Sequence, residues 1–406
     1  MSDPSLPGPH PNELPAQTDV VIIGMGIVGA MVAYRLTERG VACVAFDADG
    51  PGNGSTGRSA ACIRQQFGTP GNIRFSMFGV QLYREFHALF DFDFPVMIQN
   101  GYLFLYDRAE RFEAALGYLK VQHECGLAEA HALSPEELRR TFPHIDASGL
   151  VGATFCATDG YMWPYEICMA ALHKAKEHGL ATFANTPVTG IGLDERGRVA
   201  HVESARGRVR CRTIVNATGA WSALIAKWVG TSLPVEPIKR YLYTTHEFEA
   251  LDASGDLIKR PMTVVPNGAY LRPERPGFLL GWAHPTPPDW TFNNDVEVGY
   301  GRRDDEYGVK VLAALAEFIP ELWDTGIARA SCGFYEVTPD HNSIIDRDPH
   351  ADGLYHVTGF SGHGIMHAPA AGLAIAEWIL DGAPHSIDTS EFRLDRDFGH
   401  VEGMVI

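Results

Sequence analysis

At 406 residues the chain is long enough to form two domains, each with a substantial hydrophobic core. Its formal net charge of −17, from 33 basic and 50 acidic residues, argues against nucleic acid or an anionic membrane surface as the main partner. The seven cysteines are scattered, with no Cys-x-x-Cys pair, which indicates a reducing compartment, for which we expect the cytoplasm, without disulfides or a zinc site. No apolar stretch reaches membrane-spanning length, and residues 1–17 predict a flexible N-terminal tail.

Residues 18–49 have the pattern of a dinucleotide-binding βαβ unit. An apolar strand at 20–23 leads into three glycines and a helix, and a second strand ends at Asp47, whose carboxylate suits ribose hydroxyls. The glycines permit a tight turn, a close approach of a pyrophosphate, and close packing of helix on strand. An ordinary βαβ turn is the alternative. We expect the cofactor to contact Gly24, Gly26, Ile27, Val28, Gly29, Asp47 and Ala48.

The loop that follows is rich in glycine and hydroxyl residues, which suits backbone donation to a phosphate-bearing ligand. Together with the first motif, its Gly54-Ser55-Thr56-Gly57-Arg58-Ser59 run resembles the D-amino-acid oxidase superfamily of FAD enzymes, in the branch of sarcosine oxidase, glycine oxidase and dimethylglycine dehydrogenase. The resemblance implies FAD contacts from Ser55, Thr56, Arg58, Ser59, Ala60 and Ala61. It also implies that Arg64 holds a substrate carboxylate, as a guanidinium does through paired hydrogen bonds; an arginine at the rim of the core is the alternative.

The middle of the chain carries two more matches to this family. Helices are predicted at 72–90 and 165–179, with a short strand at 102–105. Asp159-Gly160 followed by Pro164 resembles a segment that returns the chain to the FAD domain, although Trp163 stands where the family has an acid. The segment 213–222, in which a β-branched strand ends in Ala217-Thr218-Gly219 before a helix, closes the nucleotide site in this family. Further FAD contacts are expected from Pro187, Val188, Ala217, Thr218, Gly219 and Trp221.

Short β-like runs between 234 and 330 resemble the antiparallel substrate-binding sheet of the family. Tyr270 and His284 are candidate substrate contacts on it. Where related oxidases carry a lysine that promotes the reaction with oxygen, this chain has Leu279 or Leu280, which favours another electron acceptor.

Two segments near the end complete the resemblance. Some relatives attach FAD through a cysteine at the position of Gly333; neighbouring strand residues face opposite sides, so Cys332 is predicted to pack in a core and FAD to bind noncovalently. Tyr335 falls at an active-site tyrosine. The second segment precedes a helix at about 367–381, whose N-terminus suits an anionic flavin. Its expected contacts are Gly359, Gly362, His363, Gly364, Ile365 and Met366, of which Met366 replaces a carboxylate-binding lysine.

Two other readings of these segments are weaker. His363 is a poor candidate for a general base, because an imidazole in a glycine loop often only orients backbone. Asp340 and His341 lack the further ligands of a metal site, and no metal is predicted.

The resemblance implies a two-domain α/β flavoprotein with a Rossmann-like FAD-binding domain and an antiparallel-sheet α+β substrate domain. We predict the FAD-binding domain at 18–90, 150–225 and 330–390, the substrate domain at 91–149 and 226–329, and a C-terminal tail at 391–406. The expected lining of the substrate pocket is Arg64, Tyr161, Tyr270, His284, Tyr335 and Met366.

The implied reaction is hydride transfer from a carbon next to nitrogen to flavin N5. The expected substrate is a small amino acid with a secondary or N-methylated amine, and the acceptor is oxygen or an electron carrier. Three alternatives stay open: a 2-hydroxy-acid dehydrogenase, the flavin subunit of a larger hetero-oligomeric dehydrogenase, and a nicotinamide dehydrogenase. A homo-oligomer is also compatible with the sequence.

Overall fold

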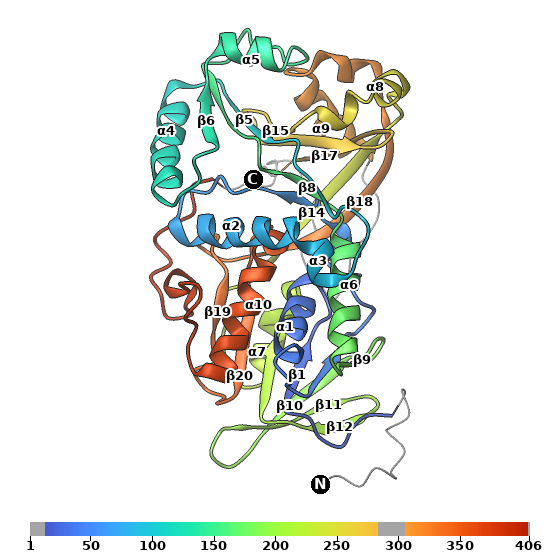
Figure 1. Ribbon diagram of the computed structural model, residues 1–406, viewed down its shortest axis with the longest axis vertical. Helices are drawn as coiled ribbons and strands as arrows, with labels where there is room; N and C mark the ends of the chain where they lie inside the picture. Colours follow the sequence, from blue (N-terminus) through green and yellow to red (C-terminus); the bar gives the residue numbers. More distant parts are fainter. Residues whose placement is uncertain (1–12, 283–304, 405–406) are drawn as a thin grey trace.

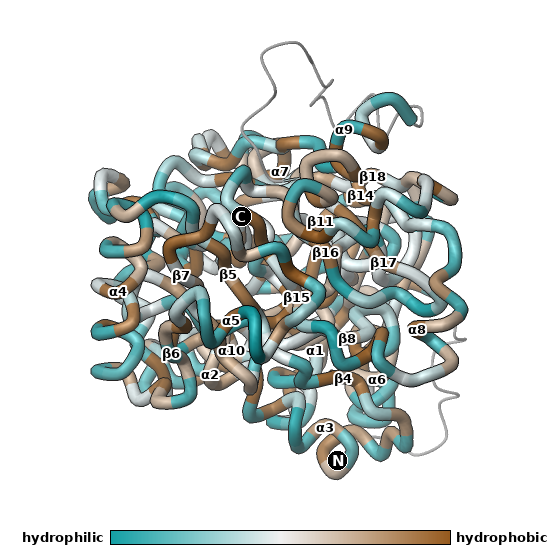
Figure 2. The backbone as a smooth tube through the Cα atoms, turned by 90° about the horizontal axis from the view of Figure 1, so that it is seen from above, coloured by the Kyte–Doolittle hydropathy of each residue, from teal (hydrophilic) through white to brown (hydrophobic). Residues whose placement is uncertain are grey.

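The computed structural model describes residues 13–282 and 305–404. Two large sheets lie one above the other along the long axis of the molecule (Figure 1). Seen from above, the strands in the middle are hydrophobic and the outer helices and loops are mostly hydrophilic (Figure 2). The two-domain α/β architecture predicted from the sequence is confirmed.

The lower sheet has six strands, five of them parallel, with β19 antiparallel at one edge. Its order is β19 (Ile344–Arg347), β20 (Leu354–Thr358), β13 (Thr213–Asn216), β1 (Val20–Ile23), β2 (Cys43–Phe46) and β9 (Ala181–Phe183). The central strands are buried on both faces, as their continuous apolar sequences predict.

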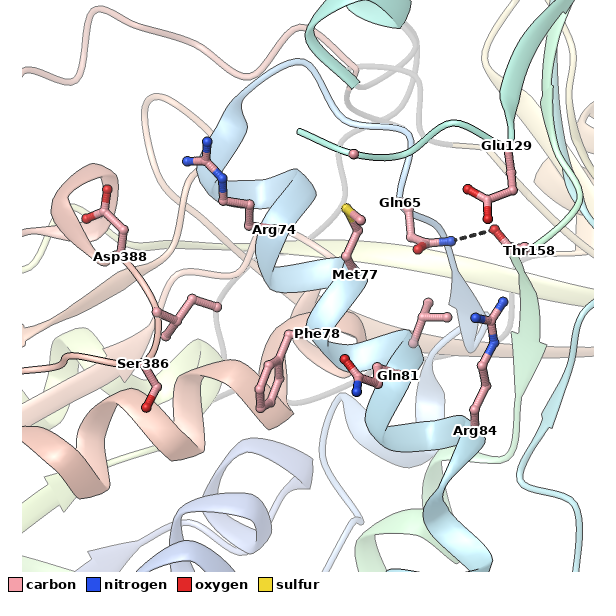
Figure 3. Close-up of a pocket in the computed structure, with 13 residues that line it drawn as sticks. Gln65, Arg74, Met77, Phe78, Gln81, Arg84, Glu129, Thr158, Ser386 and Asp388 are labelled. Carbon is pink, nitrogen blue, oxygen red and sulfur yellow. Dashed lines mark hydrogen bonds between the residues drawn. The ribbon is translucent and has the colours of Figure 1, made fainter. Parts of the chain in front are cut away.

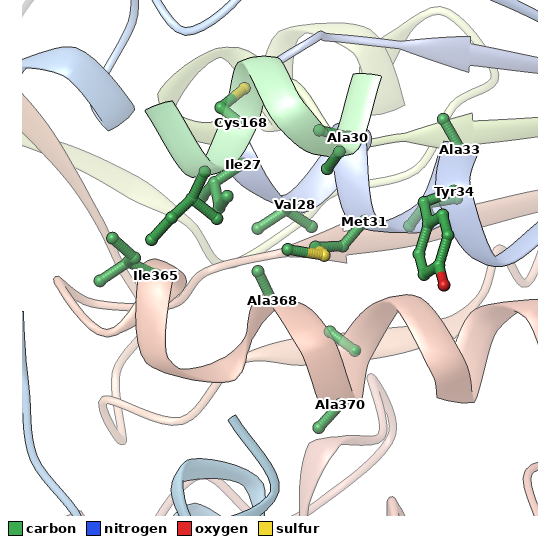
Figure 4. Packing of buried hydrophobic residues seen from close by; sticks show 14 of the residues in the cluster. Ile27, Val28, Ala30, Met31, Ala33, Tyr34, Cys168, Ile365, Ala368 and Ala370 are labelled. Carbon is green, nitrogen blue, oxygen red and sulfur yellow. The ribbon is translucent and has the colours of Figure 1, made fainter. Parts of the chain in front are cut away.

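Helices cover one face of this sheet, and a small sheet covers the other. The core under the helices joins α1 (Ile27–Thr37) to α6 (Pro164–Glu177) and α10 (Gly364–Asp381) (Figure 4). Next to α10 lies α2 (Pro70–Arg84), which is followed by α3 (Phe86–Phe90), so the single helix predicted at 72–90 is two helices. On the other face lie β10 (Val188–Leu193), β11 (Val199–Ser204) and β12 (Gly207–Arg210), while α7 (Ser222–Lys227) follows β13.

The upper sheet has eight strands and mixed directions. Its order is β18 (Ile327–Val337), β14 (Glu236–Thr245), β17 (Gly277–Trp282), β16 (Ala269–Glu274), β15 (Met262–Val264), β5 (Tyr102–Tyr106), β7 (Gly152–Cys156) and β6 (Ala130–Leu133). The other elements around it are α4 (Ala109–Glu124), α5 (Pro135–Thr141), α8 (Glu249–Ser254) and α9 (Asp305–Ala316). A fourth sheet, of β3 (Cys62–Ile63), β8 (Gly160–Met162) and β4 (Met97–Ile98), completes the described fold.

Four of the predicted boundaries differ from this arrangement. The predicted limits at 150 and 330 assign β7 and most of β18 to the FAD-binding domain. Both strands instead belong to the upper sheet. Residues 13–17 are held against the sheet of β10, β11 and β12, where Gln17 forms a β-bridge with Arg210. The predicted flexible tail therefore extends too far along the chain. The predicted tail at 391–406 includes the fully buried Glu402. Of the two predicted tails, residues 1–12 and 405–406 lie outside the described chain.

Candidate functional site

The three glycines of the first motif form a cradle that leaves no room for side chains. Gly24 has a φ of +100°, and a Cβ there would lie 2.5 Å from the carbonyl oxygen of Ala217. A Cβ on Gly29 would lie 2.0 Å from the carbonyl oxygen of Gly24. Because both obstacles are backbone, these positions require glycine, as the sequence predicted.

The N-terminus of α1 opens onto the loop after β2. Gly26, the residue before the helix, has no side chain to cap it, and the Thr56 hydroxyl accepts a hydrogen bond from the Ile27 amide at 3.0 Å instead. The same loop is fixed to the upper sheet, because the Ser55 hydroxyl donates to the Phe334 carbonyl at 2.6 Å. The free amides and the helix dipole at this end favour an anion.

Asp47 ends β2 beside this cradle. Its carboxylate accepts hydrogen bonds from the Met25 amide at 2.8 Å and the Asp49 amide at 3.0 Å, one on each oxygen. Burial nevertheless raises the pKa of Asp47. Each carboxylate oxygen keeps acceptor capacity for a ribose hydroxyl. The Thr186 amide donates to the Asp47 carbonyl at 2.8 Å, which brings the segment before Pro187 and Val188 to the same edge.

The segment after β13 closes the other side of the cradle. The Ala217 amide donates to the Ile23 carbonyl, and the Thr218 hydroxyl donates to the Asn216 side chain at 2.7 Å. Gly219 has a φ of +57°, and Trp221 packs edge-on against Phe334 at 6.1 Å. Cradle, acid and helix N-terminus together fit the ADP end of a dinucleotide such as FAD.

One face of the upper sheet is turned toward the lower part of the chain. A Cβ on Gly333 would lie 3.0 Å from Cβ of Arg58, and Tyr335 on the same strand packs its ring against Gly362. Tyr270 lies across Gly281, whose Cβ would be 2.3 Å from its ring. The Tyr270 and Tyr335 hydroxyls are therefore within hydrogen-bonding reach of each other, although two strands separate β16 from β18.

Strand alternation settles one choice that the sequence left open and agrees with one prediction. Leu279 packs in the cluster with Tyr270 and Tyr102 on the site face, whereas Leu280 packs in the core on the opposite face. Leu279 is thus the residue facing the site. Cys332 also packs in the opposite core, beside Tyr241 and Tyr243, as predicted.

Arg64 is completely buried under this face. Its guanidinium donates to the backbone carbonyls of Gln66 and Met404 and lies 3.8 Å from the centre of the Phe67 ring. His363 Nε2 lies 3.3 Å from Arg64 Nη2 and accepts its hydrogen, because a guanidinium only donates. Burial, and next the charge of Arg64, hold the pKa of His363 well below its usual range. Among the residues that the structure describes, no acid forms an ion pair with Arg64.

The backbone around Arg64 is fixed by a buried acid from the returning segment. Asp159 accepts hydrogen bonds from the Gln65 amide at 2.9 Å, from the Gln65 side chain at 2.9 Å and from the Gln66 side chain at 3.1 Å. Burial raises the pKa of Asp159 to about 6 despite these donors. The aspartate of the Asp159-Gly160 motif therefore positions the loop at residues 64–69, which we call the arginine loop.

The glycine loop before α10 lies at the contact of the two sheets. Gly359 and Gly362 have φ values of +73° and +91°, and Gly364 begins the helix. Ile365 and Met366 are buried in the lower core, and a Cβ on Gly79 of α2 would lie 2.1 Å from the Met366 carbonyl oxygen. The loop is thus clamped between α2 and Tyr335.

Residues 400–404 are part of the site. The Glu402 carboxylate accepts hydrogen bonds from the Gly68 amide at 2.7 Å, the Thr69 amide at 3.0 Å and the Asn72 side chain at 3.1 Å, where α2 begins. Met404 packs in the cluster that contains Tyr102 and Tyr270. The tail predicted for this segment is wrong, because a buried carboxylate fixes it to the arginine loop.

The remaining predicted residues lie as follows. Tyr161 is buried, and the Arg272 guanidinium lies 4.9 Å from its ring centre. His284 is outside the described residues. Asp340 forms an ion pair with Arg396 at 2.7 Å. Within 13–282 and 305–404, no group of three or more His, Cys, Asp or Glu residues could hold a metal, and none of the cysteines forms a disulfide.

Two surface grooves lie outside this site. One, of about 490 Å³, runs along α2 and is lined by Gln65, Arg74, Met77 and Arg84, among others (Figure 3). The Gln65 side chain donates a hydrogen bond to Thr158 at its edge, and Arg64 is not among its lining residues. The other, of about 880 Å³, lies between residues 230–234, 346–353 and 393–398. Neither groove contains a residue that the sequence predicted for the site.

Three site residues were missed from the sequence. Glu336 lies under the loop at Gly359: the Thr358 hydroxyl donates to its carboxylate at 2.9 Å, and burial raises its pKa to about 7. Tyr102 and Arg240 lie on the site face of the upper sheet. The only sequence signal for Tyr102 and Arg240 is the alternation of residues along β5 and β14. That alternation does not tell which face of the sheet borders the site.

Comparisons with known proteins agree with this geometry. The family model of FAD dependent oxidoreductases matches residues 19–378. FAD-dependent oxidoreductase domain-containing protein 1 of Bos taurus is 31% identical over 94% of this chain and 85% of its own length. Human mitochondrial sarcosine dehydrogenase is 26% identical over 93% of this chain, which spans 42% of that longer protein.

A solved structure, that of L-proline dehydrogenase from P. horikoshii, matches with a TM-score of 0.84 and 30% identity, covering 94% of this chain and 97% of that one. Glycine oxidase from Geobacillus kaustophilus shares the fold, with a TM-score of 0.81. No helix among the described residues is both long and apolar enough to cross a membrane. The resemblance inferred from the motifs is confirmed: this chain is an enzyme of the FAD-dependent oxidoreductase family that contains sarcosine dehydrogenase, dimethylglycine dehydrogenase and glycine oxidase.

Proposed function

We propose that the enzyme oxidises the carbon–nitrogen bond of a small amino acid, preferably with a secondary or N-methylated amine, to an imine that water hydrolyses. The observation that carries this proposal is Arg64, a fully buried guanidinium without an acidic partner among the described residues, next to a sheet face lined by Tyr270 and Tyr335. Relatives named for sarcosine, dimethylglycine and proline give further support.

Arg64 holds the substrate carboxylate in this mechanism. Its present acceptors are two neutral carbonyls, those of Gln66 and Met404. A carboxylate is a stronger acceptor for a guanidinium, because the hydrogen bond is then charge-assisted and paired. The substrate displaces the Met404 carbonyl and fixes its reacting carbon over the cofactor site, which supplies the orientation that hydride transfer needs.

FAD supplies the hydride acceptor when it is bound. The substrate amine reaches the site neutral, because within the described part of the chain no group next to Arg64 takes its proton: His363 already accepts a hydrogen from the guanidinium, and burial holds its pKa low. Burial raises the pKa values of Tyr270 and Tyr335, so both stay protonated and orient the amine as hydroxyl groups. We expect kcat/KM to rise with pH up to the pKa of the substrate amine.

Three finer features belong to the same proposal. Leu279 offers no charge to promote a reaction with oxygen, which supports an electron carrier as acceptor. FAD is bound noncovalently, since Gly333 has no side chain and Cys332 lies in the opposite core. The enzyme works in a reducing compartment such as the cytoplasm, consistent with seven cysteines and no disulfide among the described residues.

The experiment is an anaerobic absorbance titration of the purified protein with a panel of amino acids and 2-hydroxy acids. Bleaching of the flavin bands by an N-methyl or cyclic amino acid supports the proposal, and bleaching by hydroxy acids alone contradicts it. The variant Arg64→Ala should raise KM far more for carboxylate substrates than for matching neutral amines. Acid precipitation should leave all yellow colour in the supernatant; colour in the pellet would exclude noncovalent binding.

A further inference from the structure

A second guanidinium, that of Arg240, lies on the same face of the upper sheet. Arg240 is on β14 and pairs in register with Gly333 of β18, two residues before Tyr335. Its guanidinium lies 5.5 Å from the centre of the Tyr335 ring. Arg240 therefore borders the space between this sheet and the loop at Gly362, against which Tyr335 packs.

The hydrogen-bond donors of the Arg240 guanidinium are poorly satisfied. Its Nε is buried without any hydrogen-bond acceptor, and its contact with its neighbour's carbonyl, that of Lys239, is long, at 3.5 Å. No Asp or Glu within the described ranges forms an ion pair with it. A buried donor without an acceptor costs free energy, and an anion is the acceptor that a guanidinium binds most strongly. In contrast, Arg272 on the same face is paired with Glu274 at 2.6 Å.

Arg64 and Arg240 border the same sheet face, since Arg64 lies 5.7 Å from the centre of the Phe104 ring, which packs in the cluster that contains Tyr270. Both charges lower the pKa of Tyr335, which burial raises overall, so Tyr335 lies within the field of both. One substrate carboxylate balances one of the two guanidinium groups and leaves the other unbalanced. The pyrophosphate of the cofactor does not supply the missing charge, since the cradle for it is formed by Gly24, Gly26 and Gly29 at the N-terminus of α1.

We propose that the substrate carries a second anionic group, and that Arg240 binds it. The inference rests on the proposed function, with Arg64 as the partner of the α-carboxylate. The substrate class is then an amino acid with an acidic side chain or an acidic N-substituent. Arg240 is a specificity residue: it pairs with a part of the substrate that does not react, while the carbon–nitrogen bond is placed by Arg64 and the two tyrosines.

The test compares matched substrates that differ by one carboxylate. Iminodiacetate is compared with N-methylglycine, and N-methylaspartate with N-methylalanine, by anaerobic flavin reduction in the wild-type enzyme and in Arg240→Gln. We expect the wild type to prefer the dicarboxylate of at least one pair, and Arg240→Gln to lower kcat/KM for it about 100-fold while changing the monocarboxylate less than about threefold. Arg210→Gln, on the exposed β12, removes the same charge far from the site and serves as control.

A second readout needs no turnover. Malonate and succinate should perturb the absorbance of the bound oxidised flavin at lower concentrations than acetate does, and Arg240→Gln should abolish that difference. If no amine reduces the flavin but this binding preference is present, the proposed reaction fails and the anion subsite stands. Equal losses for both members of a pair, or a loss of FAD affinity with unchanged selectivity, would overturn the assignment of Arg240 to the substrate.

Discussion

Replacement of Gly29 by alanine is a direct test of the cradle. The new Cβ would lie 2.0 Å from the Gly24 carbonyl oxygen, so helix and strand must separate by roughly 1 Å to reach even the 3.0 Å limit of real contacts. Overpacking against backbone costs about 3 kcal/mol. Alanine returns about 1 kcal/mol of helix propensity, so we expect a net loss of about 2 kcal/mol.

This strain should appear in cofactor binding, because α1 carries its N-terminus away from the phosphate site when it moves. A loss of about 2 kcal/mol corresponds to a roughly 30-fold higher Kd for FAD. The assay is quenching of flavin fluorescence on titration into apoprotein, together with the midpoint of urea unfolding. Gly117→Ala is the matched control: Gly117 is also helical, in α4, with open space around it, and should gain up to about 1 kcal/mol. Wild-type affinity and an unchanged midpoint in Gly29→Ala would refute the argument.

Three further predictions concern the upper sheet and the buried acids. Gly281→Ala should displace the Tyr270 ring, lowering kcat at least about tenfold with FAD content unchanged; wild-type kcat would remove that ring from the site. The pKa of Glu336 is raised in the folded enzyme to about 7 from 4.5, so the folded state binds the extra proton and stability falls as pH rises between these values. Glu336→Gln should remove up to about 3 kcal/mol of this decrease in the free energy of unfolding, measured by urea unfolding at pH 5 and 8. Parallel pH profiles for the wild type and the variant would contradict the prediction. Glu402→Ala leaves the Gly68 and Thr69 amides, just before α2, unpaired and should cost about 2–4 kcal/mol, whereas Val401→Ala at an exposed position should cost less than about 0.5 kcal/mol; equal losses would argue against the clamp.

Local patterns made the cofactor half of the site predictable. The glycines, the strand that ends in Asp47 and the hydroxyl loop lie within a few tens of residues, where spacing alone dictates which backbone atoms meet. The three loops that converge on them follow strands whose carboxyl ends share one sheet edge. The same edge receives the Ala217 and Gly359 segments, which the family resemblance had predicted for the site.

The substrate half depends on contacts between distant residues. Arg240 meets Gly333 only because β14 pairs with β18. Along the chain these two strands are separated by β15, β16 and β17 and their connections. A shift of one residue in that register would turn Arg240 into the core and Lys239 toward the site. The burial of Arg64 depends on Met404, more than 300 residues away, whose backbone carbonyl carries no sequence signature at all. Neither relationship could be read from composition or periodicity.

The order of strands in the lower sheet sets when the enzyme can acquire its cofactor. Strand β13 is the neighbour of β1, and β20 pairs with β13, while α10 packs on α1 so closely that a Cβ on Gly372 would touch the backbone of Met31. A ribosome therefore releases the first cradle residues long before the elements that enclose them. Until about residue 381 has emerged, the nascent chain exposes one flank of α1 and one edge of the sheet. We therefore expect the cofactor to bind only after α10 has been synthesised, and the unfinished chain to be more prone to aggregation than the complete one.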